Sequence, residues 1–594
     1  VIVMIFFAGS IGGDWFNEEK VIEYYNEYYE IEFKGQCKMA SRMNFVLLDN
    51  NKEADICIYE DEYVCIYGDL VNAFWLDGRR KSTKFCIELA VNYAKKGIDV
   101  IQRIAGEFSF VLIDFKKERA YMIRDHFGIK QLFWSKVDEM IVFSNFLYGL
   151  KDFYETNIIS QEYVKKFYNN NGLLDFSETP YINVSRVNVA SYIEIDLMYG
   201  NFCDKEYWSL ISERDKKNNF KLDEDGWVEK IDGLIRTSIN NRKKDKMSLL
   251  LSGGLDSTTL YSYLSEEDKN IDLEAFSAVF DELSSCDERE YINELVDGHS
   301  KDIFNYVSCD NAGILEGCPY SYFYTSEPHV NVINKALNEQ LFNAIKNKGY
   351  RYVVDGFFAD HIFGGSIYYV MDELKKCKFL GAFNYIKEYA EASNKNIREV
   401  FWKEILPVRK KKMHGITEQV IEENSKELSK IKKYSNCDMI VQIRSSIARN
   451  FADFELAPRY GLECIHPFVD IELVKALYDI PGQYKCSYGV NKEILRKVSR
   501  NRLPQKIVER VVKTNHTELS QKGLRDNWGE IYSVLSVGRI CKLNFLNISV
   551  EEWKEKIVLF RNGEKFDDNI WILISLEMWL YSIAKKYGTV KISE

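Results

Sequence analysis

The chain has 594 residues, of which 46% are hydrophobic and 28% are charged, and its formal net charge is −11. One hydrophobic core rarely organises a chain of this length, so we expect about two to four domains. The acidic balance argues against a general nucleic-acid binder, because such proteins carry an excess of basic residues that neutralises phosphates.

Thirteen cysteines are scattered along the chain, with no C-x-x-C pair and no Cys/His spacing typical of zinc sites. A reduced, cytoplasmic protein is the simplest interpretation. The opening run Val1–Ala8 is apolar, but it is too short to span a bilayer and has no basic leading segment. We expect it to form a first buried strand.

The first 200 residues are predicted to be rich in β-strands. Short apolar or alternating runs, separated by turn residues, fall at Phe45–Leu48, Val64–Tyr67, Phe108–Asp114, Ala120–Ile123 and Ile141–Ser144. With a few helices between them, these runs predict an α+β domain built as a β-sandwich.

Two segments of this region are more specific than strand patterning. Gly106–Leu112 reads GEFSFVL, and Arg124–Leu132 reads RDHFGIKQL. They resemble the GxFAF and RDxxGxxPL segments of the glutamine-hydrolysing domain of class II amidotransferases, which is the N-terminal half of asparagine synthetases. The resemblance implies an amidotransferase-like domain over residues 1–205.

The same resemblance implies a reaction that this domain is not expected to perform. In class II amidotransferases an N-terminal Cys attacks the glutamine amide, and its own α-amine acts as the base. The first cysteine here is Cys37, and Tyr67-Gly68-Asp69 stands where the family has the Asn-Gly-Glu segment of the oxyanion hole. We therefore expect a domain that is retained as structure without glutaminase activity.

A strand, a glycine loop and a helix are predicted over Leu249–Thr259, after an amphipathic helix that begins near Gly226. Gly253 and Gly254 let the backbone approach a bound group closely, and the following helix start offers N–H groups to an anion. The loop is not a Walker A sequence, because no Lys-Ser/Thr follows the glycines.

A βαβα pattern continues from this loop through the helix Thr258–Leu264, the strand Leu273–Phe280 and the helix Asp287–Val296. Alternation of this kind predicts an α/β doubly wound parallel sheet. We place it in a second domain over residues 226–594.

The Ser-Gly-Gly-x-Asp-Ser sequence of the loop resembles the pyrophosphate loop of the ATP pyrophosphatases, enzymes that split ATP between its α and β phosphates. The resemblance implies an ATP site at the carboxyl ends of the strands, where ligands lie in such sheets. Its residues are Leu250, Ser252, Gly253, Gly254, Leu255, Asp256 and Ser257, with Ala278 on the next strand.

A second strand-then-loop segment, Tyr352–Gly365, resembles the GxGADExFGG segment of asparagine synthetases. In that family the opening residues, here Asp355 and Gly356, contact ATP, and the loop Asp, here Asp360, helps to bind Mg²⁺. This ion is commonly held by one or two carboxylates plus phosphates, so Asp256 and Asp360 are the predicted pair. Taken alone, Asp360 is equally consistent with a helix cap.

Phe357 departs from the family, because asparagine synthetases have Glu and β-lactam synthetases have Tyr at this position. A phenyl ring neither removes nor relays a proton. The base that deprotonates the attacking amine therefore lies elsewhere, or comes with the substrate. His361 is one option, although a structural role is the commoner one for such a residue.

Residues 366–440 are predicted to be helical and rich in Lys and Glu, with few motifs. Within them, Lys410–Ile431 has the pattern of an exposed amphipathic hairpin. It is either a docking or lid element or a plain surface helix.

The resemblance to asparagine synthetases resumes at Tyr460–Asp470, which is similar to GxExRxPFLD, and runs through Asn491–Lys497 to Leu503-Pro504. It implies that Lys513 is the catalytic lysine, with Arg510 before it. A fixed cation at this place suits the negative charge that builds on the leaving pyrophosphate and on the tetrahedral intermediate.

The residues and the resemblance together predict an asparagine-synthetase-like ligase that uses ATP and Mg²⁺. A substrate carboxylate is adenylated, pyrophosphate leaves, and an amine attacks to form an amide. Because the glutaminase is expected to be inactive, the amine is expected to come with the substrate. Phe357, the chain length and the Arg510-x-x-Lys513 spacing resemble lasso-peptide cyclases, which close a macrolactam in a peptide.

Such a cyclase implies a precursor (core) peptide as substrate and a leader-peptide protease as partner, optionally with a leader-binding protein. No nucleic acid and no integral membrane segment are expected. Two alternatives remain open. One is ammonia-dependent amidation of a small acid or a peptide carboxylate; the other is a non-catalytic scaffold homologue, which intact Asp256, Asp360 and Lys513 disfavour.

Overall fold

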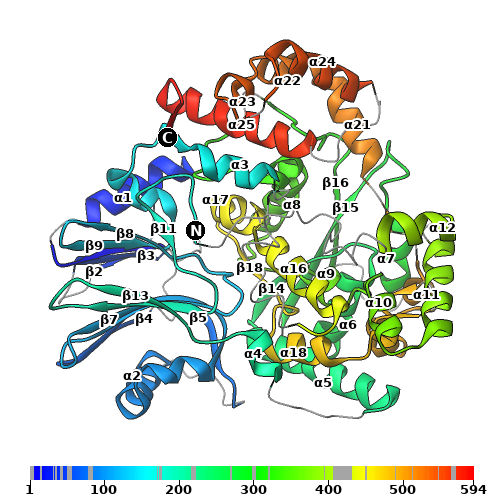
Figure 1. The fold of residues 1–594 in the computed structure, drawn as a ribbon, viewed down its shortest axis with the longest axis horizontal. Helices are drawn as coiled ribbons and strands as arrows, with labels where there is room; N and C mark the ends of the chain where they lie inside the picture. The colour runs from blue at the N-terminus through cyan, green and yellow to red at the C-terminus, as the bar shows by residue number, and fades with distance from the viewer. Residues whose placement is uncertain are drawn as a thin grey trace.

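The computed structural model describes residues 6–13, 17–30, 32–33, 36–39, 44–49, 57–77, 85–169, 172, 177–215, 222–267, 271–296, 303–318, 322–392, 395–405, 431–448, 451–487, 490–511, 513–514, 516–545, 547–562 and 570–593. An N-terminal part with two antiparallel sheets lies beside a C-terminal part built on a parallel sheet (Figure 1). The hairpin predicted over Lys410–Ile431 lies outside the described residues, apart from Ile431.

The N-terminal part has four layers: helix, sheet, sheet, helix. The first sheet has the order β11 (Ser185–Arg186), β8 (Phe133–Val137), β9 (Met140–Ser144), β1 (Phe6–Ile11), β3 (Asn44–Asp49) and β2 (Gln36–Met39). The second has the order β13 (Phe202–Glu206), β12 (Ser191–Asp196), β7 (Arg119–Arg124), β6 (Ile104–Asp114), β5 (Val64–Trp75) and β4 (Cys57–Glu60). Helix α1 (Glu18–Tyr29) covers the first sheet and α2 (Phe85–Lys96) the second, above and below the sheets in Figure 1.

Alternation along the strands explains this layering. Phe7 and Phe45 of the first sheet point into the space between the sheets, where they meet Tyr67 and Val111 of the second. Phe6, one residue earlier, points to the other side and packs with α1. Because successive side chains of a strand face opposite ways, an almost continuous apolar run buries both faces of a sheet. The predicted α+β part with facing antiparallel sheets is confirmed.

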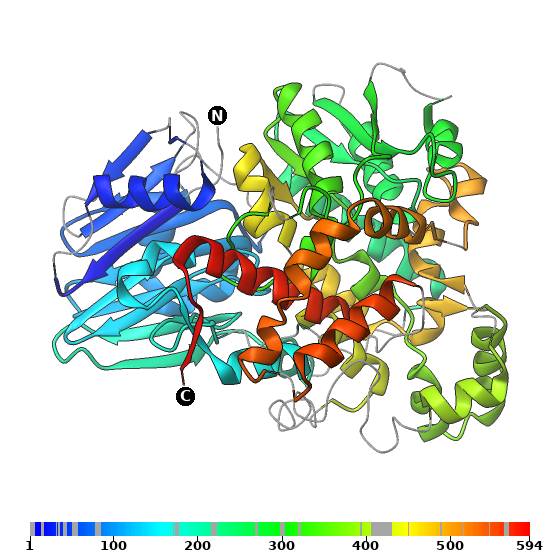
Figure 2. The ribbon, with the colours of Figure 1, turned by 90° about the horizontal axis from the view of Figure 1, so that it is seen from above.

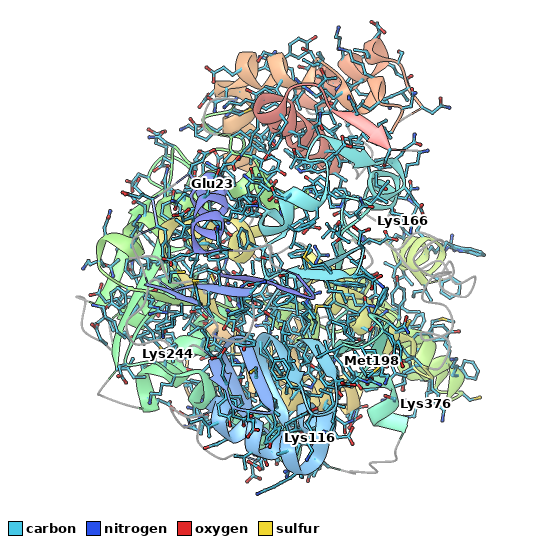
Figure 3. The ribbon with its side chains drawn as sticks, turned by 90° about the vertical axis from the view of Figure 1, so that its left-hand side faces the viewer. Glu23, Lys116, Lys166, Met198, Lys244 and Lys376 are labelled. Atoms are coloured by element: carbon cyan, nitrogen blue, oxygen red, sulfur yellow. The ribbon has the colours of Figure 1, made fainter. Side chains whose placement is uncertain are left out.

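The predicted strands are present, and the longest ones extend beyond the runs that indicated them. The run Val64–Tyr67 is only the start of β5, which continues to Trp75 through a bulge between Asp69 and Asn72. The opening apolar run contributes Phe6–Ala8 to β1. Figure 3 shows this part from its outer side, with Lys116 and Met198 in the turns that follow β6 and β12.

The C-terminal part is organised by a parallel sheet with the order β16 (Phe304–Ser308), β15 (Asp272–Val279), β14 (Lys246–Leu250), β17 (Tyr352–Val354) and β18 (Glu463–Ile465). Every neighbouring pair is parallel. Val353 packs in one apolar cluster with α8 (Lys335–Asn347), and Val354 packs in another with α5 (Glu224–Arg242) and α6 (Leu255–Glu267). Helices therefore cover both faces, as a doubly wound sheet requires.

The other helices complete the C-terminal part. They are α4 (Leu210–Asp215), α7 (Arg289–Val296), α9 (Ala359–Phe363), α10 (Tyr369–Lys375), α11 (Phe379–Ala392), α12 (Ile397–Glu399), η5 (Val400–Ile405), α16 (Tyr434–Ala448), η6 (Ala452–Leu456), α17 (Ala457–Tyr460), α18 (Ile471–Asp479), α19 (Glu493–Ser499), α20 (Gln505–Val508), α21 (Thr517–Asp526), α22 (Trp528–Leu535), α23 (Arg539–Lys542), α24 (Val550–Arg561) and α25 (Ile570–Tyr587). The short 3₁₀ turns are η1 (Gly97–Arg103), η2 (Leu147–Phe153), η4 (Val330–Asn334) and η7 (Gly482–Tyr484), and α3 (Gln161–Asn169) belongs to the N-terminal part.

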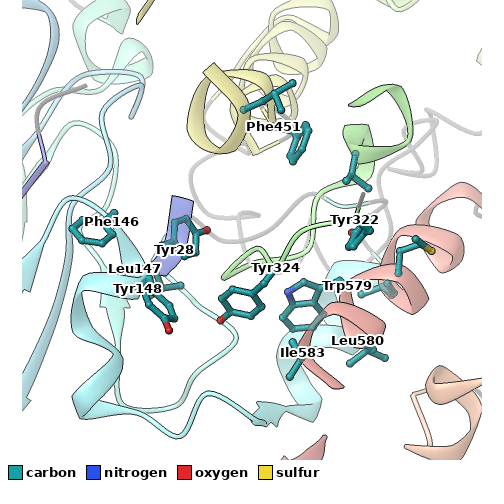
Figure 4. Close-up of a cluster of buried hydrophobic side chains, with 14 of the residues drawn as sticks. Tyr28, Phe146, Leu147, Tyr148, Tyr322, Tyr324, Phe451, Trp579, Leu580 and Ile583 are labelled. Carbon is teal, nitrogen blue, oxygen red and sulfur yellow. The ribbon is translucent and has the colours of Figure 1, made fainter. Parts of the chain in front are cut away.

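The two parts share an apolar core. Tyr28 of α1 and Tyr148 of η2 lie within 6.0 Å of the ring of Tyr324, and Trp579 of α25 donates its indole N–H to Thr325 O at 2.9 Å (Figure 4). Seen from above, α25 lies across the junction (Figure 2). At its end, β21 (Lys591–Ser593) pairs in parallel with β10 (Ile158–Ser160), so the C-terminal end of the described chain is joined to the N-terminal part by backbone as well as by side chains. The remaining pair is β19 (Cys486–Ser487) with β20 (Val490–Asn491).

Among the described helices, none has both the length and the apolar composition needed to cross a membrane. Eleven described cysteines carry free thiols, whereas Cys86 is disulfide-bonded. The fully reduced state expected from the scattered cysteines is therefore wrong at Cys86, because spacing along the sequence does not show which thiols meet in space.

Candidate active site

The turn Ser252–Ser257, between β14 and α6, is held by its own hydroxyl groups. Ser257 Oγ accepts a hydrogen bond from Ser252 N at 3.1 Å, and Ser252 Oγ accepts one from Gly254 N at 3.2 Å. Leu250, at the end of β14, is in register with Phe276 of β15, so Ala278 lies toward the same edge of the sheet. The N-terminus of α6 therefore opens at the carboxyl edge of the strands, which is a favourable place for an anion.

Gly253 is covered by three side chains. A Cβ at this position would lie 2.7 Å from Tyr291 Cβ and 3.1 Å from Arg510 Nη1, so the loop requires glycine. Arg510 donates to Gly253 O at 2.9 Å, pairs with Glu288 at 2.8 Å and stacks 3.9 Å above the Tyr291 ring. Glu288 in turn accepts from Gly253 N. The structure thus places Arg510 as a buried group that holds the loop.

Asp256, in the first turn of α6, and Asp360, in the first turn of α9, converge on one ammonium group. Lys492 Nζ lies 2.6 and 2.5 Å from the two carboxylate oxygens of Asp256 and 2.7 Å from Asp360 Oδ1. Lys513 Nζ reaches the same Asp360 oxygen at 2.5 Å. The side chain of Lys492 is 5% exposed and that of Lys513 is 68% exposed. The fold therefore brings Asp256, Asp360 and Lys513 together around Lys492.

Lys492 and Glu288 were missed from the sequence. Lys492 lies in the Asn491–Lys497 segment, which served only to mark the resemblance, and it adopts a left-handed backbone with φ of 60°. The sequence signal for Lys492 is its place inside this segment, whereas its strained backbone, which points to a special role, is visible only in the structure. Glu288 carries no comparable signal.

The two carboxylates of the site differ in their pKa shifts. Burial raises the pKa of Asp256, and Lys492 offsets this only in part. Burial acts in the same direction on Asp360, but Lys492 and Lys513 outweigh it and lower its pKa. Burial alone lowers the pKa of Lys513, and the two carboxylates more than reverse that effect. Asp360 is therefore an anion and Lys513 a cation at neutral pH.

The donor chemistry fits Mg²⁺ with a triphosphate. Asp256 and Asp360 would hold the ion through carboxylate oxygens, the ligands that Mg²⁺ prefers. Lys492 and Lys513 would face the phosphate oxygens. Within the part of the chain that the structure describes, no group of three or more His, Cys, Asp or Glu side chains is arranged to bind a metal by itself.

The residues after β17 bring a second backbone against the glycine loop. A Cβ on Gly356 would lie 3.1 Å from Asp256 Cβ, closer than most side-chain contacts. Asp355 accepts a hydrogen bond from Phe357 N at 3.0 Å, which closes the turn. The structure thus places Asp355 and Gly356 next to Asp256.

Phe358 holds the start of α9 in an uncommon conformation. Its φ of 80° lies in the left-handed region that favours glycine, and the resembling segment has Gly at this place. Its ring is 1% exposed and lies 5.4 Å from the ring of Phe127, in the N-terminal part. His361, on the same short helix, lies with its ring 6.2 Å from that of Phe358. The turn from β17 into α9 is therefore packed directly onto the N-terminal part.

The segment expected to replace the oxyanion hole is occupied by structural contacts. The Tyr67 ring is buried between the two sheets, and its hydroxyl donates to Glu60 at 2.8 Å. Asp69 is paired with Lys130 at 3.0 Å, and Lys130 also contacts Glu463 of β18 at 3.2 Å. Lys130, held by Asp69, therefore joins the N-terminal part to the parallel sheet.

Comparison with known proteins agrees with this architecture. The asparagine synthase family model matches residues 230–580, and a glutamine amidotransferase domain matches residues 68–208. The chain is 24% identical over 229 residues to "Asparagine synthetase [glutamine-hydrolyzing] 2" of Bacillus subtilis, a stretch that covers 36% of this chain and 30% of the relative. A protein of Methanocaldococcus jannaschii, also named as an asparagine synthetase, is 25% identical over 346 residues, covering 56% of this chain and 64% of that one.

A fungal relative, "Amidase chyE" of Penicillium rubens, is 23% identical over 323 residues, which cover 52% of this chain and 46% of the amidase. The matched stretches span less than two thirds of the length of each of these relatives. The family match, in contrast, extends over more than half of this chain and contains all the carboxylates and lysines gathered at the sheet edge. The chain belongs to the asparagine synthase family.

Proposed function

We propose that the chain is an ATP-dependent carbon–nitrogen ligase that activates a substrate carboxylate, with release of pyrophosphate, and joins it to an amine. The observation that carries the proposal is the convergence of Asp256, Asp360, Lys492 and Lys513 beside the Ser252–Ser257 turn. Two carboxylates suit Mg²⁺, and two ammonium groups suit charge that builds on phosphate oxygens.

Each group has its own task in this proposal. ATP supplies the AMP group that makes the carboxylate reactive. The N-terminus of α6 binds phosphate oxygens, and Arg510 keeps Gly253 in the conformation that leaves room for them. Lys513 stabilises the negative charge on the leaving group and on the tetrahedral centre.

The amine is proposed to belong to the same molecule as the carboxylate, so that the product is a macrolactam in a peptide, as in lasso-peptide cyclases. Phe357 supports this choice, because its ring packs on His466 at 4.9 Å and offers no group that deprotonates a free amine. A tethered amine reaches an effective concentration that no free amine matches. The proposed substrate is then a precursor peptide, with a leader-peptide protease and a leader-binding protein as partners.

Ammonia-dependent amidation of an acid is the second candidate. The names of the bacterial relative and of the archaeal relative favour it, since one is named an asparagine synthetase and the other a putative asparagine synthetase. The two candidates differ in the origin of the nitrogen, which a product mass distinguishes.

The test is to incubate the protein with ATP, Mg²⁺, the protease and a co-encoded precursor peptide. We expect one pyrophosphate per product and a product lighter than the linear core peptide by one water. Asp256→Asn, Asp360→Asn and Lys513→Ala should each lower the rate by about 10²- to 10³-fold. Asp196→Asn, which changes a carboxylate at the last residue of β12, is the matched control and should keep the wild-type rate.

Amidation of a carboxylate by added ammonia, with no ring formed, would replace the macrolactam proposal by the second candidate. Wild-type protein that releases no pyrophosphate with any carboxylate would contradict both. The N-terminal part is proposed to be inactive on glutamine, which predicts no glutamate release above that of a boiled sample.

A further inference from the structure

His466 lies between two carboxylates that come from distant parts of the chain. Its Nδ1 is 2.7 Å from Asp355 Oδ1, and its Nε2 is hydrogen-bonded to Asp453 Oδ2. Asp355 follows β17, His466 follows β18, and Asp453 belongs to η6. We call this arrangement the Asp355–His466–Asp453 clamp. A ring with a carboxylate at each nitrogen donates from both, as only the protonated imidazole does.

The charge of the clamp follows from its surroundings. The His466 side chain is 1% exposed, and burial alone lowers the pKa of an imidazole. The carboxylates of Asp453 and Asp355 outweigh burial and hold the pKa of His466 well above its ordinary value. The imidazolium therefore persists at neutral pH, with one donor committed to each carboxylate.

One end of the clamp belongs to the proposed active site. Asp355 Oδ1 accepts from His466 and from Phe357 N, so a single oxygen fixes both the ring and the turn. Gly356, between Asp355 and Phe357, packs against Asp256. A shift of Asp355 would therefore move the backbone that limits the position of Asp256.

The other end is anchored on the π-helical turn η6. Asp453 holds His466, and Glu455 in the same turn accepts hydrogen bonds from Tyr28 OH of α1, with 2.7 Å to each carboxylate oxygen. A π-helical turn rotates its side chains out of the ordinary helical register, and such turns are frequent at functional sites. Through His466, the η6 turn thus supports the loop that begins at Asp355, and through Glu455 it contacts the N-terminal part.

We propose that His466 is a positioning residue for carboxylate activation: by bridging Asp355 and Asp453 it fixes the Asp355–Phe358 loop against Asp256. The inference rests on the proposed function and deepens it, and His466 acts through Asp355 without touching the substrate. Groups that orient the ligands of a metal site typically contribute about 10- to 100-fold to activity.

The first test uses His466→Gln, because an amide has one donor group and one acceptor and so serves only one of the two carboxylates. We expect kcat for pyrophosphate release to fall by about 10- to 100-fold, with KM for ATP and the thermal midpoint close to those of the wild type. Asp453→Asn should give the same fall. The double variant should be no worse than either single one, because both act through one unit.

The matched control is His126→Gln. His126 is 4% exposed, and neither ring nitrogen has a hydrogen-bond partner among the described residues. It is therefore an equally buried histidine without a clamp, and its replacement should leave kcat unchanged.

The second test does not depend on turnover. The chain has seven histidines, so in protein labelled with ¹⁵N-histidine the His466 signal is the one that His466→Gln removes. We expect two protonated ring nitrogens at pH 8 in the wild type and a neutral ring in Asp453→Asn.

An unchanged kcat in His466→Gln, or a loss that follows unfolded protein, overturns the inference, and so does a neutral His466 ring in the wild type. Wild-type protein that releases no pyrophosphate would remove the proposed function and this inference together. Normal wild-type release with an unaffected His466→Gln variant would remove only the inference.

Discussion

Lys492 and Lys513 contact the same carboxylate, Asp360, from different depths. Lys492 is nearly buried beside Asp256, whereas Lys513 is mostly exposed. Removing one partner of a buried ion pair leaves the other charge uncompensated, while an exposed pair contributes little to stability.

Lys492→Met is therefore expected to lower the free energy of unfolding by about 3–5 kcal/mol, in addition to abolishing most pyrophosphate release. Lys513→Ala should lose a comparable share of activity but at most about 1 kcal/mol of stability. Chemical denaturation of both variants beside an activity assay checks the contrast. Equal losses in the free energy of unfolding would show that the difference in burial between Lys492 and Lys513 does not change their contributions to stability.

Lys485 is a buried lysine close to α16, where its Nζ lies 3.2 Å from Met439 Sδ. Burial, with help from Lys433, lowers the pKa of Lys485 to about 7. An unfolded lysine titrates near 10.4, so between about pH 7 and pH 10 the unfolded chain binds more protons than the folded one. This group therefore makes stability rise with pH across that window.

Lys485→Met should raise the free energy of unfolding at pH 7 and flatten its rise between about pH 7 and pH 10. Denaturation curves at several pH values measure this. Lys376→Met is the control, because Lys376 is half exposed at the surface (Figure 3). A wild-type stability that is flat over this range would contradict the assignment.

At the scale of elements, the turn from β17 into α9 combines strain with packing. Phe358 has a left-handed φ, which costs an L-residue about 1–2 kcal/mol, but its buried ring packs on Phe127. Both Phe358→Ala and Phe358→Gly lose the ring, at about 3–5 kcal/mol. Only the Gly variant also relieves the strain of the left-handed backbone at this position.

We therefore expect Phe358→Gly to be more stable than Phe358→Ala by about 1 kcal/mol. Phe363, buried at the end of the same helix, is the control. At this position the stability difference between the Gly and Ala variants is expected to have the opposite sign. There the Gly variant should be less stable than the Ala variant by up to about 1 kcal/mol. Thermal or denaturant midpoints of the four variants measure both differences, and a Phe358→Ala variant at least as stable as Phe358→Gly would exclude strain at Phe358.

At the scale of the whole molecule, buried charges join the N-terminal part to the parallel sheet. Lys130 lies between Asp69 and Glu463, and Asn72 also donates to Glu463 at 2.9 Å. Nearby, Arg242 of α5 lies 3.7 Å from Glu107 of β6. Burial raises the pKa of Glu463, but Lys130 and its basic neighbours outweigh it and lower that pKa. This interface therefore sets Glu463 of the parallel sheet against Lys130 and Asn72 of the N-terminal part.

Lys130→Met is expected to lower the free energy of unfolding by about 3–5 kcal/mol, because two buried carboxylates lose their cation. The triple variant Lys130→Met, Asp69→Asn, Glu463→Gln removes the charges together and should recover most of that loss. Denaturation followed by tryptophan fluorescence measures both. A single variant as stable as the wild type, or a triple variant no better than the single, would contradict this account.

The sequence determined the local features of this protein. Short, nearly continuous apolar runs located the strands, because a strand with two buried faces needs apolar residues on both. The glycines and hydroxyls of Ser252–Ser257 marked the turn between β14 and α6, since its hydrogen bonds are formed within six residues. The order of strands and helices gave the doubly wound sheet, because parallel strands need a helical crossover.

Only the tertiary structure decided which distant groups meet. Lys492 reaches Asp256 across 236 positions of the chain, and His466 reaches Asp355 across 111. Neither contact has a periodic signature, because each depends on how loops from separate strands close at one edge of the sheet. Arg510, predicted from sequence as a catalytic residue, likewise contacts Gly253, Glu288 and Tyr291, which no spacing along the chain indicates. Local periodicity fixes elements, whereas long-range packing assigns charged side chains their partners.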